Sequence, residues 1–414
     1  MTQQVPDNPT FPTLSLRERD RRWAALRGLM DRLDLAGLVV SGMGRDQLDR
    51  YVTNEGTRGL AVLARDGDPV SLVGTGNITL GRHDLPGADY PRWVADQRLL
   101  GPTLRLADVL TELGLASARV GVVGLSSRAP ASIAGTIPYG TWTRTLAALP
   151  DATFVDVAAD YEMLMVVHSD EELRMLRTSA EIGENACHAM IAAVAVGRRE
   201  SEIVAAGMQS VAAQGGLYLQ GPQRSGAERL GWAGPDWLWM GGGSHVLQRG
   251  DVFGQELFTF YGGFETQQQL EISLGPLSAE DRELEAVAIE SRQAGLDVLR
   301  PGLTFAELCD AMEEPLRRNG CWNMGPVVQT VSPVIFNSAT HVGLDRDPAL
   351  AGLPLPHTTP RDGDFVIEPG VAFAFEPNAC RGRRRMCIGG TVVVTESGYE
   401  ELNSVCTTVT VVDG

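Results

Sequence analysis

The stretch GDVFGQELFTFYGGFETQQQLEISLG, residues 250–275, decides the fold of this 414-residue chain. Aromatic and aliphatic residues are frequent in it, and Tyr261-Gly262-Gly263 interrupts it, a pattern typical of two antiparallel strands joined by a tight turn. Alternate residues of the second strand form a polar row, which consists of Glu265, Gln267, Gln269 and Glu271. This polar row either lines a site or faces solvent, because alternation by itself also produces a solvated sheet face.

Glu256, on the first strand of the hairpin, is expected to share a face with the polar row. A turn centred on Tyr261 and Gly262 pairs Glu256 with Gln267, whose Cβ atoms would then lie roughly 5 Å apart. A turn centred one residue later pairs Glu256 with Gln269 instead. In both registers the alternation of side chains keeps Glu256 on the polar face. The hairpin therefore predicts a cluster of carboxylates and amides.

Length and composition indicate a soluble enzyme of two domains. A chain of 414 residues exceeds what one core usually organises, and 43% hydrophobic with 21% charged residues is ordinary for a globular enzyme. The net charge of -17 argues against nucleic acid or an anionic membrane as the main partner, and it permits cationic ligands without requiring them. Six cysteines without a CxxC pair, and no apolar run typical of a signal peptide or a membrane span, predict a cytoplasmic protein.

Two domains are also indicated by the order of the elements. Residues 1–160 alternate short β-rich runs with amphipathic helices, the first of which is preceded by a capping box at Ser15, and this pattern predicts an α/β domain. Residues 161–414 carry long helices that follow capping boxes at Ser169 and Thr304, with strands expected over 251–274, 364–376 and 387–396, which predicts an α+β domain. The basic run 381–385 between two of these strands is expected to form a solvated turn.

Four ordered segments resemble one family. The hairpin 250–275 is similar to that of the creatinase, aminopeptidase P and methionine aminopeptidase family, which has the pita-bread fold. The stretches IEPGVAFAFEPNA (367–379) and IGGTVVVTESGYEEL (388–402) resemble two later strands of the family. The stretch YEMLMVVHSDEELRMLRTSAEIGENA (161–186) resembles its boundary segment. The resemblance implies a pita-bread catalytic domain preceded by a smaller creatinase-type α/β domain.

Most members of this family bind two divalent ions through two Asp, one His and two Glu. By resemblance the two Asp positions fall on Glu256 and Gln267, and the two Glu positions fall on Glu376 and Gly389. The His position has its nearest candidate in His341, without the usual GHGxG motif. A neutral amide and a hydrogen cannot replace two anionic ligands, so the resemblance predicts no resident metal. The alternative is a single divalent ion on Glu256, Glu265, Glu376 and His341.

Creatinase itself provides a metal-free precedent within the family. There a His carries the proton, two Glu hold a guanidino-type substrate, and arginines bind its carboxylate. By resemblance one of these Glu falls on Glu376, the other on Gln269, and the His position near Gly241, a few residues before His245. The candidate catalytic residues are therefore Glu376, His341 and His245. The candidate substrate-binding residues are Glu256, Glu265, Gln267, Gln269, Glu271, Trp237, Trp239, Arg58 and Arg346.

The last four of these candidates rest on weaker signals. Trp237 and Trp239 lie in GPDWLWMGGG, which resembles a loop that borders the family's pocket, although core packing would explain them equally well. Arg346 and Arg58 are candidate carboxylate clamps, and either is otherwise a surface residue. Arg58 would act from the partner subunit, because creatinase-type enzymes resemble head-to-tail homodimers with the site near the subunit interface.

Together these observations favour a metal-independent, creatinase-like hydrolase. It would cleave a C–N or related bond of a small polar metabolite that bears an amine or amidine, using His and Glu as acid and base, with elimination as a variant of the chemistry. One alternative is a metal-dependent Xaa-Pro-type aminopeptidase or dipeptidase with altered ligands. Another is a catalytically silent protein that binds a small molecule or a peptide.

Overall fold

The chain folds into two compact units. The computed structural model describes residues 11–42, 48–56, 59–74, 91–101, 104–126, 135–228, 230–231, 234–350, 358, 360 and 362–413. Unit 1 comprises Met1–Val166 with Ser332–Ile335, and unit 2 comprises Val167–Val331 with Phe336–Gly414.

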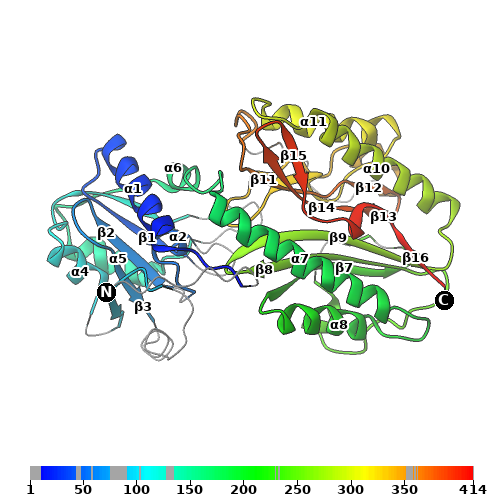
Figure 1. The fold of residues 1–414 in the computed structure, drawn as a ribbon, viewed down its shortest axis with the longest axis horizontal. Coiled ribbons are helices and arrows are strands. Elements are labelled where there is room, and N and C mark those ends of the chain that lie inside the picture. The colour runs from blue at the N-terminus through cyan, green and yellow to red at the C-terminus, as the bar shows by residue number, and fades with distance from the viewer. Residues whose placement is uncertain are drawn as a thin grey trace. The chain divides into compact units, whose positions relative to one another are not determined.

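Unit 1 is an α/β domain, as its alternating pattern predicts. Its strands form one mixed sheet in the order β4-β3-β2-β1-β5-β6, in which β1 runs antiparallel to β2 and parallel to β5 (Figure 1). The helices are α1 (Leu16–Arg32), α2 (Arg50–Thr53), α4 (Leu106–Glu112), α5 (Tyr139–Ala148) and α6 (Ala158–Glu162). The strands are β1 (Gly37–Ser41), β2 (Gly59–Ala64), β3 (Val70–Val73), β4 (Asp96–Leu99), β5 (Arg119–Val123) and β6 (Thr153–Asp156).

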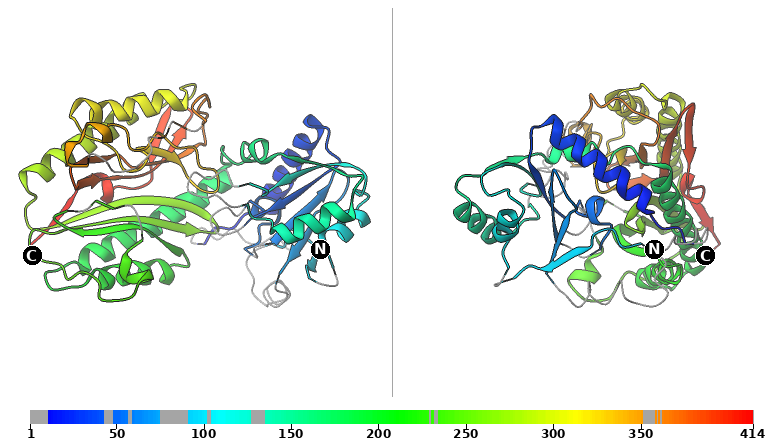
Figure 2. Two further views of the ribbon diagram at one scale, coloured as in Figure 1. Left: turned by 180° about the vertical axis from the view of Figure 1, so that it is seen from behind. Right: turned by 60° about the vertical axis from the view of Figure 1, so that its left-hand side comes forward.

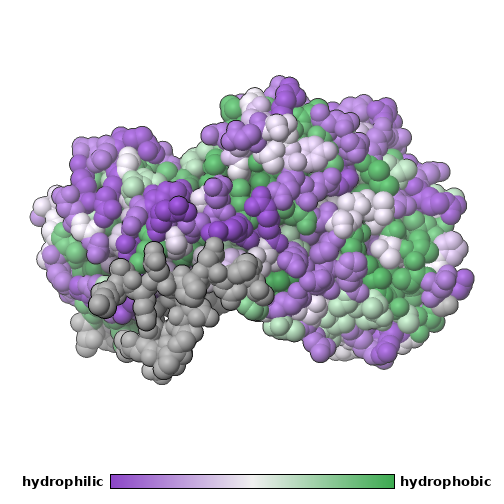
Figure 3. All heavy atoms as spheres, in the orientation of Figure 1, coloured by the Kyte–Doolittle hydropathy of each residue, from purple (hydrophilic) through white to green (hydrophobic). Residues whose placement is uncertain are grey.

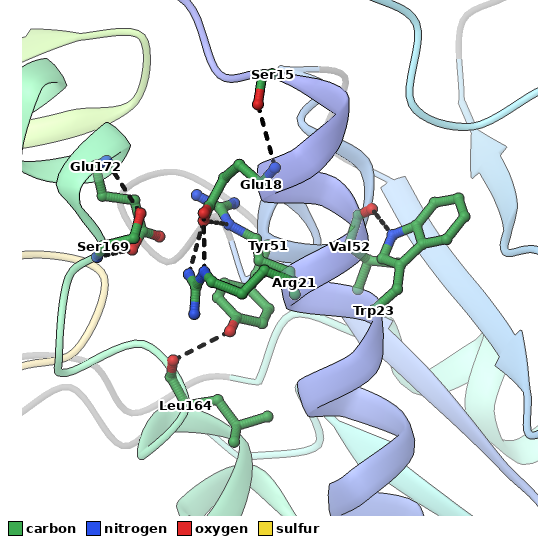
Figure 4. A network of polar contacts seen from close by, with 10 residues as sticks. Ser15, Glu18, Arg21, Trp23, Tyr51, Val52, Leu164, Ser169 and Glu172 are labelled. Atoms are coloured by element: carbon green, nitrogen blue, oxygen red, sulfur yellow. Dashed lines mark hydrogen bonds and ion pairs between the residues drawn. The ribbon is translucent and has the colours of Figure 1, made fainter.

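The first helix of unit 1 is held by a buried ion pair (Figure 4). Ser15 Oγ accepts the N–H of Glu18 at 3.2 Å, which is one arm of the expected capping box. The carboxylate of Glu18 does not complete the box, because it accepts hydrogen bonds from Arg21 at 2.7 Å and Arg22 at 2.8 Å. The guanidinium of Arg22 also lies over the ring of Tyr51, 4.8 Å from its centroid.

Unit 2 contains a curved, mainly antiparallel sheet with a pair of helices on each side, in which β16 runs parallel to β9. Its main path is β10-β11-β14-β9-β8-β7, while β15 pairs with β14 and β16 with β9. Two helices, α7 and α8, lie on one side of these strands and α10 and α11 on the other (Figures 1 and 2). The helices are α7 (Asp170–Ala193), α8 (Glu200–Ala213), α9 (Asp236–Trp239), α10 (Ala279–Val298), α11 (Phe305–Arg318), η1 (Leu344–Arg346), η2 (Pro348–Leu350) and η3 (Val405–Thr407). The strands are β7 (Leu217–Gly226), β8 (Val252–Tyr261), β9 (Phe264–Leu274), β10 (Val328–Thr330), β11 (Ala372–Phe375), β12 (Asn378–Arg381), β13 (Arg384–Cys387), β14 (Gly389–Thr395), β15 (Gly398–Glu401) and β16 (Thr410–Val412).

Two helices of unit 2 start at the capping boxes that the sequence predicts, whereas one strand is shorter than predicted. Both arms of the capping boxes form at Ser169 in α7 and at Thr304 in α11. The strand expected over 364–376 is wrong in extent, because only Ala372–Phe375 forms β11. Pro369 offers no N–H to a sheet, and Gly370 turns the chain at φ +90°. The pairing with β14 therefore ends at Gly370, whose N–H donates to Val394 O at 2.8 Å.

The hairpin β8–β9 has its turn at Gly262 and Gly263, whose φ angles are +54° and +85°. Positive φ at both central residues is the two-residue turn that matches the twist of an antiparallel pair. The register pairs Tyr261 with Phe264 and places Glu256 directly opposite Gln269. Of the two registers that the sequence allows, the second is therefore the one that forms.

The face of β9 opposite the polar row packs under α7. Ser179 Oγ of α7 donates to Thr259 O of β8 at 2.8 Å and lies 3.1 Å from Thr266 Oγ1. Gly183 of α7 leaves room for the side chain of Gln268, which a Cβ at this position would meet. This close helix contact fixes which face of β9 is turned away from α7, and that face carries the polar row.

The surface of both units is mainly hydrophilic, with hydrophobic residues interspersed on the face drawn in Figure 3. Among the described residues, no helix combines the length and the apolar character that crossing a bilayer requires.

Asp49 in unit 1 predicts a pH-dependent stability. Burial raises the pKa of Asp49 to about 7, although Gly59 N–H donates to its carboxylate at 3.3 Å. A carboxyl group whose folded pKa is raised stabilises the fold at low pH, and this contribution is lost as the pH rises towards 7. Asp49→Asn keeps the acceptor and removes the titration. We expect the free energy of unfolding of Asp49→Asn, relative to that of wild type, to rise by roughly 2–4 kcal/mol between about pH 4 and pH 8. Urea denaturation of both proteins at each pH measures this difference.

Glu18→Gln is the matched control for this experiment. Burial raises the pKa of Glu18, but hydrogen bonds and charge from Arg21 and Arg22 lower it overall. Its contribution is therefore present at neutral pH and lost in acid, so Glu18→Gln should lose stability relative to wild type as the pH rises. Parallel pH profiles for the two variants would contradict the assignment.

Candidate functional site

The polar row is buried and does not face solvent. Glu265 and Gln267 are fully buried, Gln269 is 2% exposed and Glu271 is 4% exposed. Glu256 and Glu376 are equally enclosed, at 3% and 1%. A buried carboxylate requires hydrogen bonds or opposite charge to offset its lost hydration. The solvated sheet face is therefore excluded for this row, and the partners of each carboxylate define the site.

The first half of the row is a relay of side-chain hydrogen bonds. Gln267 Nε2 donates to Glu265 Oε1 at 2.7 Å. Gln329 of β10 then donates its Nε2 to Gln267 Oε1 at 3.3 Å. Both ends of the Gln267 amide are thus engaged with protein groups. An amide in this position acts as a donor to a carboxylate, which an aspartate could not do.

The second half of the row connects three strands. Gln269 Nε2 of β9 donates to Glu376 Oε2, at the end of β11, at 3.4 Å. Glu256 of β8 lies opposite Gln269. The thiol of Cys387 in β13 lies 3.5 Å from Gln269 Oε1, and burial raises its pKa well above the usual range, so it is a neutral donor here. The fold therefore brings Glu256, Gln269 and Glu376 together.

The end of the row lies in a small cavity with two arginines. Cys387 N–H donates to Glu271 Oε1 at 3.2 Å. The free space in this cavity is only about 10 Å³. That is the room of about one water molecule. The residues that line the cavity include Glu256, Gln269, Glu271, Cys387, Arg224 and Arg385. The expectation that 381–385 forms a solvated turn is therefore wrong for Arg385, which is partly buried in β13 with its Nε shielded from solvent.

His341 lies in the segment after β10, in a strained backbone conformation. Its φ is +61°, which is uncommon for a residue with a Cβ and is found most often where function or packing requires it. Its N–H donates to Asn323 O at 2.8 Å, and its Nδ1 lies 3.4 Å from Thr340 Oγ1. Asn323 and Asn378 both donate to Gly325 O, and Asn378 also donates to Glu376 O. A chain of hydrogen bonds thus joins the His341 segment to the backbone of Glu376.

His245 lies elsewhere, at the open end of β8. Its side chain is 40% exposed, and Nε2 lies 2.7 Å from Asp251 Oδ2. Asp251 precedes β8, and the strand rises about 3.3 Å per residue, so Glu256 lies roughly 16 Å further along it. The structure does not bring His245 together with Glu256 and Glu376.

Three of the four remaining candidates lie outside the buried cluster. Trp237 is half-buried and donates its Nε1 to Glu200 Oε2 at 3.1 Å, whereas Trp239 is 77% exposed. Arg346 is exposed in η1. Arg58 lies outside the described residues. Arg385, Cys387, Gln329 and Arg224 were not predicted, although the alternation of Arg385 and Cys387 in a short strand places both on one face and could have suggested the first two.

A pair of divalent ions does not fit these residues. Gln267, at one expected ligand position, gives both ends of its amide to protein partners. Gly389, at another, has a φ of +126°, and a Cβ built there would overlap Phe375 O. Any side chain at 389 would therefore require the backbone to move. In the ranges that the structure describes, no group of three or more His, Cys, Asp or Glu is arranged to hold a metal ion.

Comparison with known proteins places this geometry in a family. Residues 174–396 match the model of metallopeptidase family M24. A creatinase from Bacillus sp. (strain B-0618) is 22% identical over 94% of this chain and 92% of its own length. A Xaa-Pro dipeptidase from Pyrococcus furiosus is 22% identical over 58% of this chain and 63% of its own length.

The fold is also shared with solved structures. The structure of a Xaa-Pro dipeptidase from Bacillus anthracis superimposes with a TM-score of 0.72, covering 95% of this chain and all of the other, at 18% identity. At this identity the likeness shows the fold. It confirms the pita-bread catalytic domain with a smaller N-terminal domain that the sequence resemblance predicts.

Gly389 offers a direct test of the site geometry. Gly389→Ala should lower the free energy of unfolding by roughly 2 kcal/mol or more, because alanine disfavours this φ and its Cβ meets Phe375 O. Gly398→Ala in β15 is the control, since open space surrounds that position and its φ is not in the left-handed region. Urea denaturation compares the two, and equal stability of both variants would contradict the described backbone at 389.

Proposed function

Because the chain belongs to metallopeptidase family M24 and is a hydrolase of that family, we propose that it cleaves a C–N or related bond of a small polar metabolite without a resident metal. The proposed substrate bears an amine or amidine group. The observation that carries this proposal is the pair of amide-to-carboxylate hydrogen bonds, from Gln267 to Glu265 and from Gln269 to Glu376.

The two amides support a metal-free site for a physical reason. In a dinuclear site, carboxylates are held apart and neutralised by the ions between them. Here Gln267 and Gln269 each donate an N–H to a carboxylate, and such a charge-assisted hydrogen bond stabilises the anion without a metal. The overlap at Gly389 supports the same conclusion, because it keeps a further carboxylate away from Glu376.

Glu376 is proposed to hold the cationic or N–H end of the substrate. It is 1% exposed, and Gln269 fixes one of its oxygens, so its orientation is set before a substrate binds. Glu256, directly opposite Gln269, is proposed to line the substrate site beside Glu376. The match to a creatinase over 94% of the chain supports this substrate class.

His341 is proposed as the proton carrier, in preference to His245. A histidine titrates near neutral pH and can both accept and return a proton. The hydrogen bonds that tie the backbone of the His341 segment, through Asn323 and Asn378, to the backbone of Glu376 support its choice only by position, since they hold this segment near Glu376. The hydrogen bond between His245 and Asp251, at the surface, supports a structural role for His245 instead.

A second function is favoured by the relatives themselves. The Xaa-Pro dipeptidases from P. furiosus and B. anthracis share sequence or fold with this chain. A metal-dependent Xaa-Pro dipeptidase with altered ligands is therefore the competing candidate. We further propose a cytoplasmic homodimer, consistent with six free, buried cysteines and a net charge of -17.

Glu376→Gln tests the proposed role of this carboxylate. The substrate panel contains guanidino acids and N-alkyl amino acids on one side and Xaa-Pro dipeptides on the other. On the substrate that wild type turns over, we expect Glu376→Gln to lower kcat/KM by roughly 100-fold or more, with an unchanged circular dichroism spectrum. Glu400→Gln, which alters a half-exposed partner of Arg177, should keep wild-type activity. Full activity of Glu376→Gln would refute the assignment.

Chelation separates the two candidate functions. We expect wild type dialysed against a chelator to keep its activity towards the guanidino or N-alkyl substrate, because no step depends on a bound ion. Added Mn²⁺ should not raise the rate. Loss of activity on chelation, with recovery on Mn²⁺ and a preference for Xaa-Pro dipeptides, would instead establish the competing function.

A further inference from the structure

The basic run 381–385 places one guanidinium inside the site, and neither the family resemblance nor the proposed reaction accounts for it. Arg385 lies in β13, which pairs with β12 so that Arg385 is opposite Cys380. Its neighbours in the run have different surroundings. Arg381 pairs with Glu283 at 2.9 Å and Arg384 with Glu280 at 2.9 Å, both on α10. Of the residues in this run, Arg385 is the one that lines the cavity with Glu256 and Glu271.

The position of Arg385 follows from the strand geometry. Arg385 and Cys387 are two residues apart and therefore share one face of β13. Cys387 N–H donates to Glu271 Oε1 at 3.2 Å, which holds this part of β13 against β9. Glu271 is opposite Gly254, and Glu256 is two residues further along β8 on the same face. Three strands therefore meet at this cavity: β13 contributes Arg385, and β8 and β9 each contribute one carboxylate.

Gly254 shows how closely Glu271 is packed. A Cβ at position 254 would lie 2.8 Å from Glu271 Oε2, so only glycine leaves this carboxylate its place. Glu256 and Glu271 are 3% and 4% exposed, and two buried carboxylates at one cavity repel each other unless a cation lies between or beside them.

The electrostatics of Arg385 agree with this arrangement. Burial acts to lower the pKa of Arg385, but Cys387 and Cys380, and then Glu271 and Glu256, raise it overall. Burial raises the pKa of both thiols and keeps them neutral, so the negative charge that faces the guanidinium comes from Glu271 and Glu256. The guanidinium is therefore a permanent positive charge within the cavity. Arg224, the other arginine at this cavity, also has Asp236 within 3.7 Å, so its charge is shared with a surface carboxylate.

We propose that Arg385 is the built-in counter-cation of this site: its guanidinium neutralises Glu256 and Glu271, and it thereby prevents these carboxylates from holding a divalent ion. This inference rests on the proposed metal-free function, and Arg385 is the residue that would supply positive charge in place of a metal ion. It also divides the site in two. Glu256 and Glu271 lie beside Arg385 at the cavity, whereas Glu265 and Glu376 accept hydrogen bonds from the amides of Gln267 and Gln269. Glu376 is the carboxylate proposed above for the positively charged substrate group.

The test needs no substrate, only thermal and urea unfolding of the full chain with and without millimolar Mn²⁺ or Zn²⁺. Arg385→Met keeps the length of the side chain and removes the charge. We expect its melting temperature to fall by roughly 10 °C, because two buried carboxylates lose their cation. Either metal should recover part of this loss, whereas wild type should show no saturable shift.

Two further variants keep the test decisive. Arg385→Lys retains the charge and should resemble wild type in its lack of a metal response. The double variant Arg385→Met with Glu271→Gln removes both charges, and we expect it to regain most of the lost stability and to lose the metal response. This recovery in the double-mutant cycle distinguishes a charge pair from a mere packing defect.

The results that overturn the inference differ from those that overturn the proposed function. Arg385→Met as stable as wild type, or no coupling between Arg385 and Glu271, overturns the inference alone. So does a wild-type metal response that Glu271→Gln abolishes, because Glu271 would then be a ligand. If the metal binds wild type and the Glu271→Gln variant equally well, the proposed metal-free function is overturned, but the charge pair between Arg385 and Glu271 is not.

Discussion

The site depends on one constraint, which is that four carboxylates are buried against one sheet and each must be stabilised without bulk water. Glu256, Glu265, Glu271 and Glu376 are all at most 4% exposed. Unshielded, such a group of anions would destabilise the fold far more than ordinary packing could offset. The hydrogen bonds from Gln267, Gln269 and the backbone of Cys387 meet this requirement for three of them, and the nearby guanidinium of Arg385 complements them.

The fold supports this arrangement through a few local geometries. The turn at Gly262 and Gly263 sets the register that places Glu256 opposite Gln269. The packing of α7 against the other face of β9 keeps the polar row turned inward. Glycine at 389 lets β14 approach Phe375 O closely. A shift of one residue in the hairpin would exchange the faces of a strand and would bury the polar row under α7.

The protein therefore uses the M24 scaffold with different means of holding its charges. Its fold is similar to that of the Xaa-Pro dipeptidase from Bacillus anthracis, with a TM-score of 0.72. The expected ligand positions, in contrast, carry an amide at 267 and a glycine at 389. A common fold does not establish a common reaction, since the chemistry belongs to the side chains in the site. The guanidino-type or N-alkyl substrate class is proposed on that basis.

The family, the helix starts and the polar row could be predicted from the sequence alone. The two-domain layout was an expectation from the same source. The family was recognised from the resemblance of four ordered segments. The helix starts and the polar row rest on local signals, namely capping residues, glycine turns and strict alternation, which act over a few neighbouring residues. The sequence could not choose between two hairpin registers, and it could not tell whether the row faced solvent or protein.

The tertiary structure decided the rest, because the remaining features depend on residues that are distant in the chain. Only the folded chain shows that Gln329 reaches Gln267 and that His245 is held by Asp251 at the surface. The run 381–385 is the clearest case. Its composition indicates a solvated turn, but the pairing of β12 with β13 and their packing against β9 turn Arg385 inward, where long-range charge, rather than local pattern, fixes its role.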